Sequence, residues 1–124
     1  MMKGYQELQV WNKAYDLCLE IYKITTTFPV SEKYGLTSQI RRSAVSIPSN
    51  IAEGHERQHL KEYIQFLYVA LGSIAELKTQ MMLSKDIGYL SEKSFVKIES
   101  EIVEIGKMLN GLINSLIKKL APET

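Results

Sequence analysis

The chain has 124 residues, 45% of them hydrophobic, which predicts a single domain over residues 1–124 with one buried core. Fifteen basic residues against fourteen acidic ones give a net charge of +1, which excludes a strongly basic nucleic-acid-binding protein and leaves room only for a local cationic surface. One cysteine excludes an intrachain disulfide, and no segment has the apolar run of a signal peptide or membrane span, so we expect a cytosolic protein.

The first predicted helix covers residues 6–27, where apolar side chains recur at the spacing of one helix face. Tyr15 and Leu19 widen that face to more than half of the circumference. Pro29 and the threonines before it should end the helix. Cys18 lies on the apolar face without a neighbouring histidine in the sequence, so we interpret it as a small buried hydrophobe rather than a nucleophile.

The second predicted helix covers residues 35–53 and again has a wide apolar face, wider than the neighbours in a small bundle would cover. Pro48 removes the helical hydrogen bond to the Ala44 carbonyl, which costs about 3 kcal/mol at an interior site and predicts a kink. Gly54 is expected to end the helix in the left-handed conformation.

The third and fourth predicted helices cover residues 58–86 and 91–120 and carry continuous apolar stripes. In the third helix, Gly72 indicates either the close approach of another helix or the tolerance of a weak helix former. Gly88 and Ser91 predict a turn with positive φ and a helix cap between the two helices. Four amphipathic helices with short connections favour an all-α, antiparallel up-down-up-down four-helix bundle.

Sequence motifs that carry catalytic chemistry are missing. There is no glycine-rich phosphate loop, nucleophile elbow or metalloprotease spacing. His55 and His59 are four residues apart, with Glu56 and Glu62 nearby, so a metal site is conceivable. They lie at a predicted helix junction, where a solvated pair is the ordinary outcome, and no second cluster supplies more ligands. We therefore expect no enzymatic activity, no metal and no cofactor.

A polar stripe borders the apolar face of the second helix. Its members are Gln39, Arg42, Ser46, Ser49, Asn50 and Glu53, and Glu76 on the third helix is a candidate partner for an arginine. The stripe is either a solvated face, whose ion pairs contribute about 0–1 kcal/mol each, or an interface that presents arginines and amides to a phosphate backbone or another subunit. Because Arg42 and Glu53 lie at the edge of the apolar face, their replacement by alanine should disturb folding or assembly more than that of Lys13 or Lys23.

Four stretches of the chain resemble one known family. They are VWNKAYDL near the start, FPVSEKYGLTSQIRRSAVSIPSNIAEG in the middle, then RQHLKEYIQFLYVALGSIAEL and GYL. Over roughly residues 8–90 the chain is similar to four-helix bundle proteins encoded by intervening sequences in bacterial 23S ribosomal RNA genes. The resemblance implies an up-down bundle that assembles into a ring-like homopentamer. A related set of proteins serves diversity-generating retroelements and binds nucleic acid and a reverse transcriptase.

The resemblance also points to particular polar positions, none of them an established catalytic residue. They fall on Arg41, Arg42, Asn50, Glu53, Gly54, Arg57, Ser73 and Glu76. The apolar faces of the first two predicted helices are wider than the apolar surface that soluble monomers usually expose, which predicts a homo-oligomer. The resemblance implies that this oligomer is a pentamer. The interface candidates are Trp11, Leu17, Ile21, Val45, Pro48 and Ala52.

Three hypotheses about function remain open. In the first, the oligomer binds structured RNA through local cationic side chains, and further polar residues form a network or interface. The cationic candidates are Arg41, Arg42, Arg57 and Lys61, and the polar ones are Gln39, Asn50, Glu53, Ser73 and Glu76. In the second, the bundle is a protein–protein scaffold or adaptor, for example a reverse-transcriptase accessory-like protein, with no direct RNA binding. In the third, an enzyme has its site in the bundle core.

Overall fold

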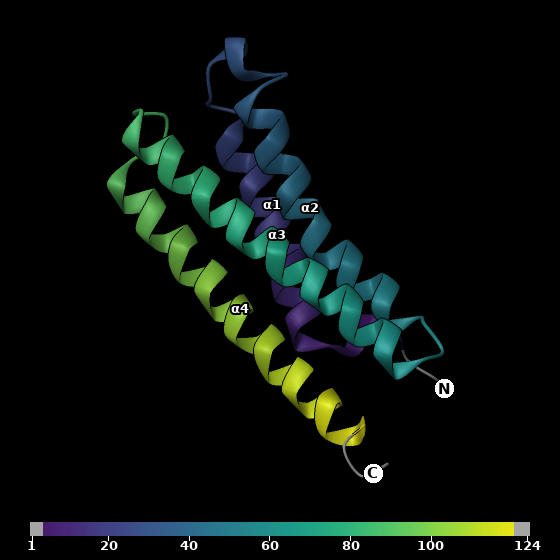
Figure 1. Cartoon of the computed structure of the whole chain (residues 1–124). Coiled ribbons are helices and arrows are strands. Elements are labelled where there is room, and N and C mark those ends of the chain that lie inside the picture. Colours follow the sequence, from purple (N-terminus) through teal and green to yellow (C-terminus); the bar gives the residue numbers. More distant parts are fainter. Residues whose placement is uncertain (1–3, 121–124) are drawn as a thin grey trace.

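Four long helices make up most of the computed structural model, which describes residues 4–120 (Figure 1). They are α1 (Gln9–Thr25), α2 (Leu36–His55), α3 (Leu60–Asp86) and α4 (Glu92–Leu120), and short 3₁₀ turns, η1 (Tyr5–Glu7) and η2 (Val30–Glu32), precede α1 and α2. No strand occurs in residues 4–120. No helix there combines the length and apolar character that crossing a bilayer requires.

Consecutive helices pack side by side. The chain reverses direction at each connection (Figure 1), so α1 packs on α2, α2 on α3 and α3 on α4, and α4 returns to contact α1. The α2–α3 contact is the most extensive. The predicted all-α four-helix bundle is therefore confirmed.

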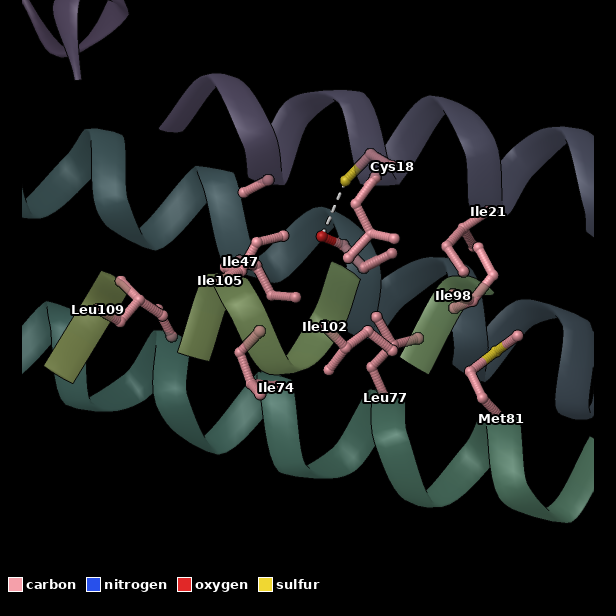
Figure 2. Packing of buried hydrophobic residues seen from close by; sticks show 14 of the residues in the cluster. Cys18, Ile21, Ile47, Ile74, Leu77, Met81, Ile98, Ile102, Ile105 and Leu109 are labelled. Carbon is pink, nitrogen blue, oxygen red and sulfur yellow. Dashed lines mark hydrogen bonds between the residues drawn. The ribbon is translucent and has the colours of Figure 1, made fainter. Parts of the chain in front are cut away.

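The core consists mainly of branched aliphatic side chains from all four helices (Figure 2). Ile21 of α1, Ile47 of α2, Leu77 of α3 and Ile102 of α4 are among those that are fully buried. Each such side chain contributes about 1.5–3 kcal/mol relative to its exposed state. The apolar stripes of the sequence are thus the main source of stability.

Helix α1 is shorter than predicted at both ends. At its start, Leu8 is extended (φ −80°, ψ 126°) and separates α1 from η1. At its end, the hydroxyls of Thr26 and Thr27 donate hydrogen bonds to the carbonyls of Lys23 and Ile24 at 2.7 and 2.9 Å. These local bonds occupy carbonyls that a longer helix would use, so α1 stops at Thr25.

Gly54 has a different role from the predicted one. It does not adopt the left-handed conformation, and α2 continues to His55. A Cβ added at Gly54 would lie 2.7 Å from Phe66 Cβ and 3.1 Å from Tyr63 Cδ1 on α3. Glycine is needed because α2 and α3 approach closely at this point.

The turn between α3 and α4 follows the prediction. Gly88 has a φ of 90°, and the Ser91 hydroxyl accepts a hydrogen bond from the Ser94 N–H at 3.1 Å, which caps α4. At Gly72, in contrast, an added Cβ would meet nothing within 4 Å, so no other helix of residues 4–120 approaches there.

Helix α2 continues through Pro48 because another residue satisfies the carbonyl that the proline leaves free. The Cys18 thiol of α1 donates a hydrogen bond to the Ala44 carbonyl at 2.9 Å, drawn as the dashed line in Figure 2. Burial raises the pKa of Cys18 to about 12, so the thiol keeps its proton and remains a donor. Cys18 is therefore buried, as predicted, but it also bridges α1 and α2.

Candidate nucleic-acid interface

A surface hollow lies along α2, beside α1 and the loop that joins the two helices. It has a volume of about 650 Å³, and its cationic lining consists of Lys33, Arg41 and Arg42. Tyrosine, hydroxyl and amide groups and the side chain of Val45 complete the lining, and no carboxylate of residues 4–120 contributes to it. We call it the cationic hollow. Since the chain carries a net charge of only +1, this is the local positive surface that the composition left room for.

Arg41 is held in place by the end of α1. Its Nε donates to Thr25 Oγ1 at 2.9 Å, and its Nη2 donates to the Tyr22 carbonyl at 3.3 Å. The guanidinium carbon also lies 4.6 Å from the centre of the Tyr22 ring. A cation beside the last carbonyls of a helix is favourable, so Arg41 joins α2 to α1 and brings its charge to the hollow.

Arg42 and Lys33 are freer than Arg41. Arg42 is exposed, and Nη2 contacts Ser38 Oγ at 3.5 Å. Lys33 Nζ lies 5.4 Å from the centre of the Tyr34 ring, and Tyr34 is 89% exposed. Both cations are therefore available to an anionic partner, next to an exposed aromatic ring.

Glu32 fixes the loop that carries Lys33 and Tyr34. Its carboxylate accepts a hydrogen bond from the Leu36 N–H at 3.0 Å, at the start of α2, and another from the Tyr89 hydroxyl at 2.9 Å. The Leu36 bond first, and then the Tyr89 bond, hold the pKa of Glu32 below its ordinary value. The loop is thus tied both to α2 and to the α3–α4 turn.

Thr37 lies between the cationic hollow and a smaller one of about 210 Å³. Its side chain is buried, and Oγ1 has no hydrogen-bond partner among the described residues. Buried hydroxyls are nearly always paired, so this atom is a free polar group at the edge of the hollow.

The other two predicted cationic residues lie elsewhere. Arg57 follows α2, donates to Glu53 Oε2 at 2.9 Å and lies over the Phe66 ring at 4.8 Å. Lys61 is exposed at the start of α3. Arg42 and Arg57 are about 22 Å apart along the chain at helical rise, so the four candidates do not form one site.

Sequence reasoning missed Lys33 and Tyr34. Both belong to the loop segment SEKYG, in which one basic and one aromatic residue are adjacent. That signal becomes visible only when the start of α2 brings the segment beside Arg41.

Two of the predicted polar-network residues join α2 to α3 through Ser46. Ser73 Oγ donates to Ser46 Oγ at 2.7 Å, and Asn50 Nδ2 donates to the Ser46 carbonyl and hydroxyl at 2.7 and 2.9 Å. Ser73 is buried and Asn50 is partly buried. Such a network rigidifies the helix pair because its buried groups are mutually satisfied.

The remaining polar candidates lie near the surface. Gln39 and Glu76 border a hollow of about 240 Å³ together with Arg42. Glu53 is exposed and paired with Arg57. A large cost of removing Arg42 or Glu53 would require buried side chains, and both of these side chains are exposed.

A second, apolar groove of about 260 Å³ runs between α1 and α2. It is lined in part by Trp11, Val45, Pro48 and Ala52, which are four of the predicted interface residues. Tyr15 also lines it and stacks on Trp11 with ring centres 5.0 Å apart. We call it the apolar groove.

Two of the interface candidates, Leu17 and Ile21, need correction. Leu17 and Ile21 are 2% and 0% exposed and belong to the bundle core. Their positions on α1 turn them toward the other helices, so they cannot contact a second folded copy. Pro48 is buried as well, but it lines the apolar groove.

The two histidines do not form a pair. His55 ends α2, with its ring 5.7 Å from that of Tyr63, whereas His59 is the extended residue before α3. Within residues 4–120, no group of three or more His, Cys, Asp or Glu side chains is arranged to hold a metal ion.

Comparison with known proteins identifies the family of this bundle. A family model described as 23S rRNA-intervening sequence protein matches residues 6–111. The chain belongs to the 23S rRNA-intervening sequence protein family. A solved structure from Bacteroides thetaiotaomicron VPI-5482, a protein with unknown function from the S23 ribosomal protein family, is 26% identical, with a TM-score of 0.76 over 84% of this chain and 97% of that one. No curated protein matches the sequence.

In this member of the 23S rRNA-intervening sequence protein family, several polar positions implied by the resemblance hold α2 in place. Arg41 binds the end of α1, Asn50 and Ser73 meet at Ser46, and Gly54 permits the contact with α3. Arg42, in contrast, makes only one long side-chain contact within residues 4–120. Its position has no comparable structural explanation.

Proposed function

We propose that this protein is a non-enzymatic homo-oligomer that binds the phosphate backbone of structured RNA at the cationic hollow. The observation that carries the proposal is the lining of the hollow, where Lys33, Arg41 and Arg42 meet without a carboxylate from the described residues. Phosphate contacts supply most of the affinity in such complexes, and arginine can bind a phosphate through two parallel hydrogen bonds.

The exposed aromatic ring beside the cations favours RNA over a simple anion. Unpaired bases stack on tyrosine in single-stranded loops and bulges, and Tyr34 is almost fully exposed next to Lys33. A hairpin whose loop bases reach Tyr34 while its backbone lies along Arg42 and Lys33 would use both groups. The name of the family refers to an intervening sequence of ribosomal RNA and supports an RNA partner without specifying one.

Assembly is proposed through the apolar groove. Trp11, Tyr15, Val45 and Ala52 form a continuous apolar surface between α1 and α2, next to the cationic hollow. A groove of this kind binds a complementary face of another copy, and a closed ring results when the rotation between copies closes. The resemblance implies that this ring has five copies. The cationic hollows of neighbouring copies would then repeat around the ring axis.

Fluorescence anisotropy with an RNA hairpin, measured between about 50 and 200 mM salt, tests the RNA proposal. The wild-type protein should bind with an affinity that falls steeply with salt. The Lys33→Ala/Arg42→Ala protein should bind about ten- to a hundredfold more weakly, and its salt slope should be smaller by about 2. Arg41 is left intact because it also joins α1 to α2.

The matched control removes two lysines from α4, Lys93→Ala/Lys107→Ala, on a different face of the bundle. It should bind RNA like the wild type. Equal losses of RNA affinity in the two double variants would mean that only the net charge matters, and would overturn the site. No binding by the wild type at low salt would overturn the RNA proposal.

Light scattering after size exclusion tests the assembly. The wild type should elute at a multiple of the 14.2 kDa chain mass, and Ala52→Glu or Val45→Glu should reduce that mass. Val103→Glu on α4 is the control for an added carboxylate on an exposed valine. A wild-type mass of 14.2 kDa at micromolar concentration would overturn the oligomer.

A protein–protein scaffold or adaptor is the second candidate function. The near-neutral charge and the aromatic lining of the apolar groove favour it. In that case the RNA titration should show no binding, whereas Ala52→Glu should still abolish partner binding or assembly.

A further inference from the structure

The outer face of α3 carries a regular stripe that no part of the described chain covers. The stripe repeats with alternating steps of four and three residues, the period of a coiled-coil seam. Its members are Lys61, Gln65, Tyr68, Gly72, Ala75, Thr79, Met82 and Asp86, all of them exposed. We call it the α3 seam. In Figure 1 no other element lies in front of α3.

Between its two ends the seam is uncharged. Tyr68 and Met82 are 48% and 45% exposed, and Val69 and Leu83 beside the seam are exposed to a similar degree. At the centre, a Cβ added to Gly72 would meet nothing within 4 Å. An exposed, uncharged stripe that presents aromatic and aliphatic side chains is typical of a protein interface, and it gives a phosphate backbone no cation to bind.

We propose that the α3 seam binds the α3 seam of a second copy of this chain, antiparallel and about a two-fold axis. The charges at the two ends select this partner. The seam begins with the cation Lys61 and ends with the carboxylate Asp86. Two antiparallel copies place Lys61 against Asp86 twice, whereas two parallel copies place like charges together at both ends.

Both end groups are accessible for such pairs. Lys61 makes no ion pair with another residue of 4–120, and the Asp86 side chain remains 68% exposed although Lys85 Nζ lies 3.7 Å from it. The end pairs therefore require no rearrangement of the bundle.

The same register is favourable along the whole seam. With Lys61 opposite Asp86, Gly72 lies opposite Ala75 and Tyr68 opposite Thr79. Small residues at the centre allow two helix axes to approach to about 8–10 Å. Two hydroxyl groups then face each other on either side of that close contact.

The exposed carboxylates beside the seam do not oppose this arrangement. Glu62 and Glu76 lie along one flank, together with Val69 and Leu83. In the antiparallel register Glu62 comes opposite Leu83 and Glu76 opposite Val69, so no two carboxylates face each other.

The seam is separate from the proposed RNA and ring surfaces, which lie on α1 and α2. A two-fold contact joins copies in pairs and cannot close a ring of five by itself. Combined with such a ring, it would join one ring to another copy outside that ring. Without a ring, it would give a dimer, so the seam does not depend on the proposed function.

Zero-length cross-linking with a carbodiimide tests the contact directly in the full chain. Lys61 and Asp86 are about 37 Å apart along one straight helix, so an amide bond between them has to join two chains. Mass spectrometry of a mixture of ¹⁴N- and ¹⁵N-labelled protein should find the mixed-isotope Lys61–Asp86 peptide. Its absence, while other intermolecular links form, would overturn the register, and a wholly monomeric protein would overturn the contact.

Exchanging the charges of Lys61 and Asp86 gives a second test, whose result differs from that expected if the two residues only stabilised the fold. Lys61→Glu and Asp86→Lys should each weaken the two-fold contact by about tenfold, because each replaces two attractive pairs with two repulsive ones. The double variant should restore it to nearly the wild-type value. Two additive losses without restoration would overturn the pairing.

Ala75→Glu, which places a carboxylate at the centre of the seam, should abolish the contact. The control is Val96→Glu on α4, where the valine is 54% exposed and lies outside the seam. Circular dichroism should show both proteins folded, since both sites are exposed. Equal masses for Ala75→Glu and the wild type, or equal losses for both variants, would overturn the assignment.

Discussion

Helix α2 has two packed sides that differ in how tightly they are closed. Toward α3, the backbone approaches closely at Gly54, and the hydroxyls of Ser46 and Ser73 meet. Toward α1, two hollows of about 650 and 260 Å³ remain, and single polar contacts such as the Cys18–Ala44 bond bridge the helices. The side toward α3 has a smaller hollow of about 240 Å³ at Arg42; it is the more closed side and mainly stabilises the bundle. The open side, toward α1, leaves charged and aromatic groups available for binding.

The largest effect on stability is expected where the closed side is tightest. Gly54→Ala should reduce the free energy of unfolding by about 3 kcal/mol, because the new Cβ meets Phe66 Cβ at 2.7 Å and backbone would have to move. Gly111→Ala in α4, where a Cβ meets nothing, should instead stabilise the protein by about 1 kcal/mol. Urea denaturation compares the two, and equal changes would contradict the close approach.

On the open side, the Cys18 thiol should stabilise the fold because Pro48 leaves the Ala44 carbonyl without its helical donor. Cys18→Ala should cost about 2 kcal/mol, since it leaves the buried Ala44 carbonyl without a donor. In a Pro48→Ala background, the restored N–H of residue 48 can bind that carbonyl, and the cost of Cys18→Ala should fall by about 1 kcal/mol. A double-mutant cycle by chemical denaturation measures this coupling, and a coupling of zero would mean that Cys18 acts only through its volume.

The polar network on the closed side should contribute less. Ser73→Ala should cost about 1 kcal/mol by removing the 2.7 Å bond to Ser46. Adding Ser46→Ala should cost less than the sum of the single changes, because the two hydroxyls share that bond. Ser115→Ala, at an exposed site on α4, is the control in the same thermal melts and should cause no loss.

At the end of the open side, Glu32 should make stability depend on pH. Its pKa is lower in the folded chain than in the unfolded one, so its contribution is present above the ordinary glutamate pKa of about 4.3 and is lost as the pH falls through the folded value. Glu32→Gln should therefore lower Tm at neutral pH, and the difference in Tm from the wild type should shrink as the pH falls below the ordinary glutamate pKa. A gap in Tm that persists in acid would contradict the role of the carboxylate.

The smallest effect on stability is expected at the exposed polar groups of α2. Arg42→Ala and Glu53→Ala should each change the free energy of unfolding by less than about 0.5 kcal/mol, no more than Lys13→Ala, which removes an exposed pair with Glu104. Thermal melts compare the three variants. A loss at Arg42 as large as that at Gly54 would mean that the open side also supports the fold.

The sequence by itself determined the helices and the bundle. The helices and the α3–α4 turn could be predicted because they depend on neighbouring residues: the helices on apolar periodicity, and the turn on Gly88 and Ser91. The resemblance carried by its middle segment also indicated the family, which the comparison confirmed. Helix ends were less predictable, because local side-chain bonds at Thr26 and Thr27 shorten α1.

Only the tertiary structure decided what each polar or special residue contacts. Gly54 permits the close contact between α2 and α3 and does not end the helix. Leu17 belongs to the bundle core and not to an oligomer interface. Both outcomes depend on how a helix is rotated about its axis relative to its neighbours. The grouping of Lys33 with Arg41 depends on how the loop folds against α2, and the exposure of the α3 seam depends on which face α2 and α4 leave uncovered. Such relations join residues that are distant in the chain, and no local pattern encodes them.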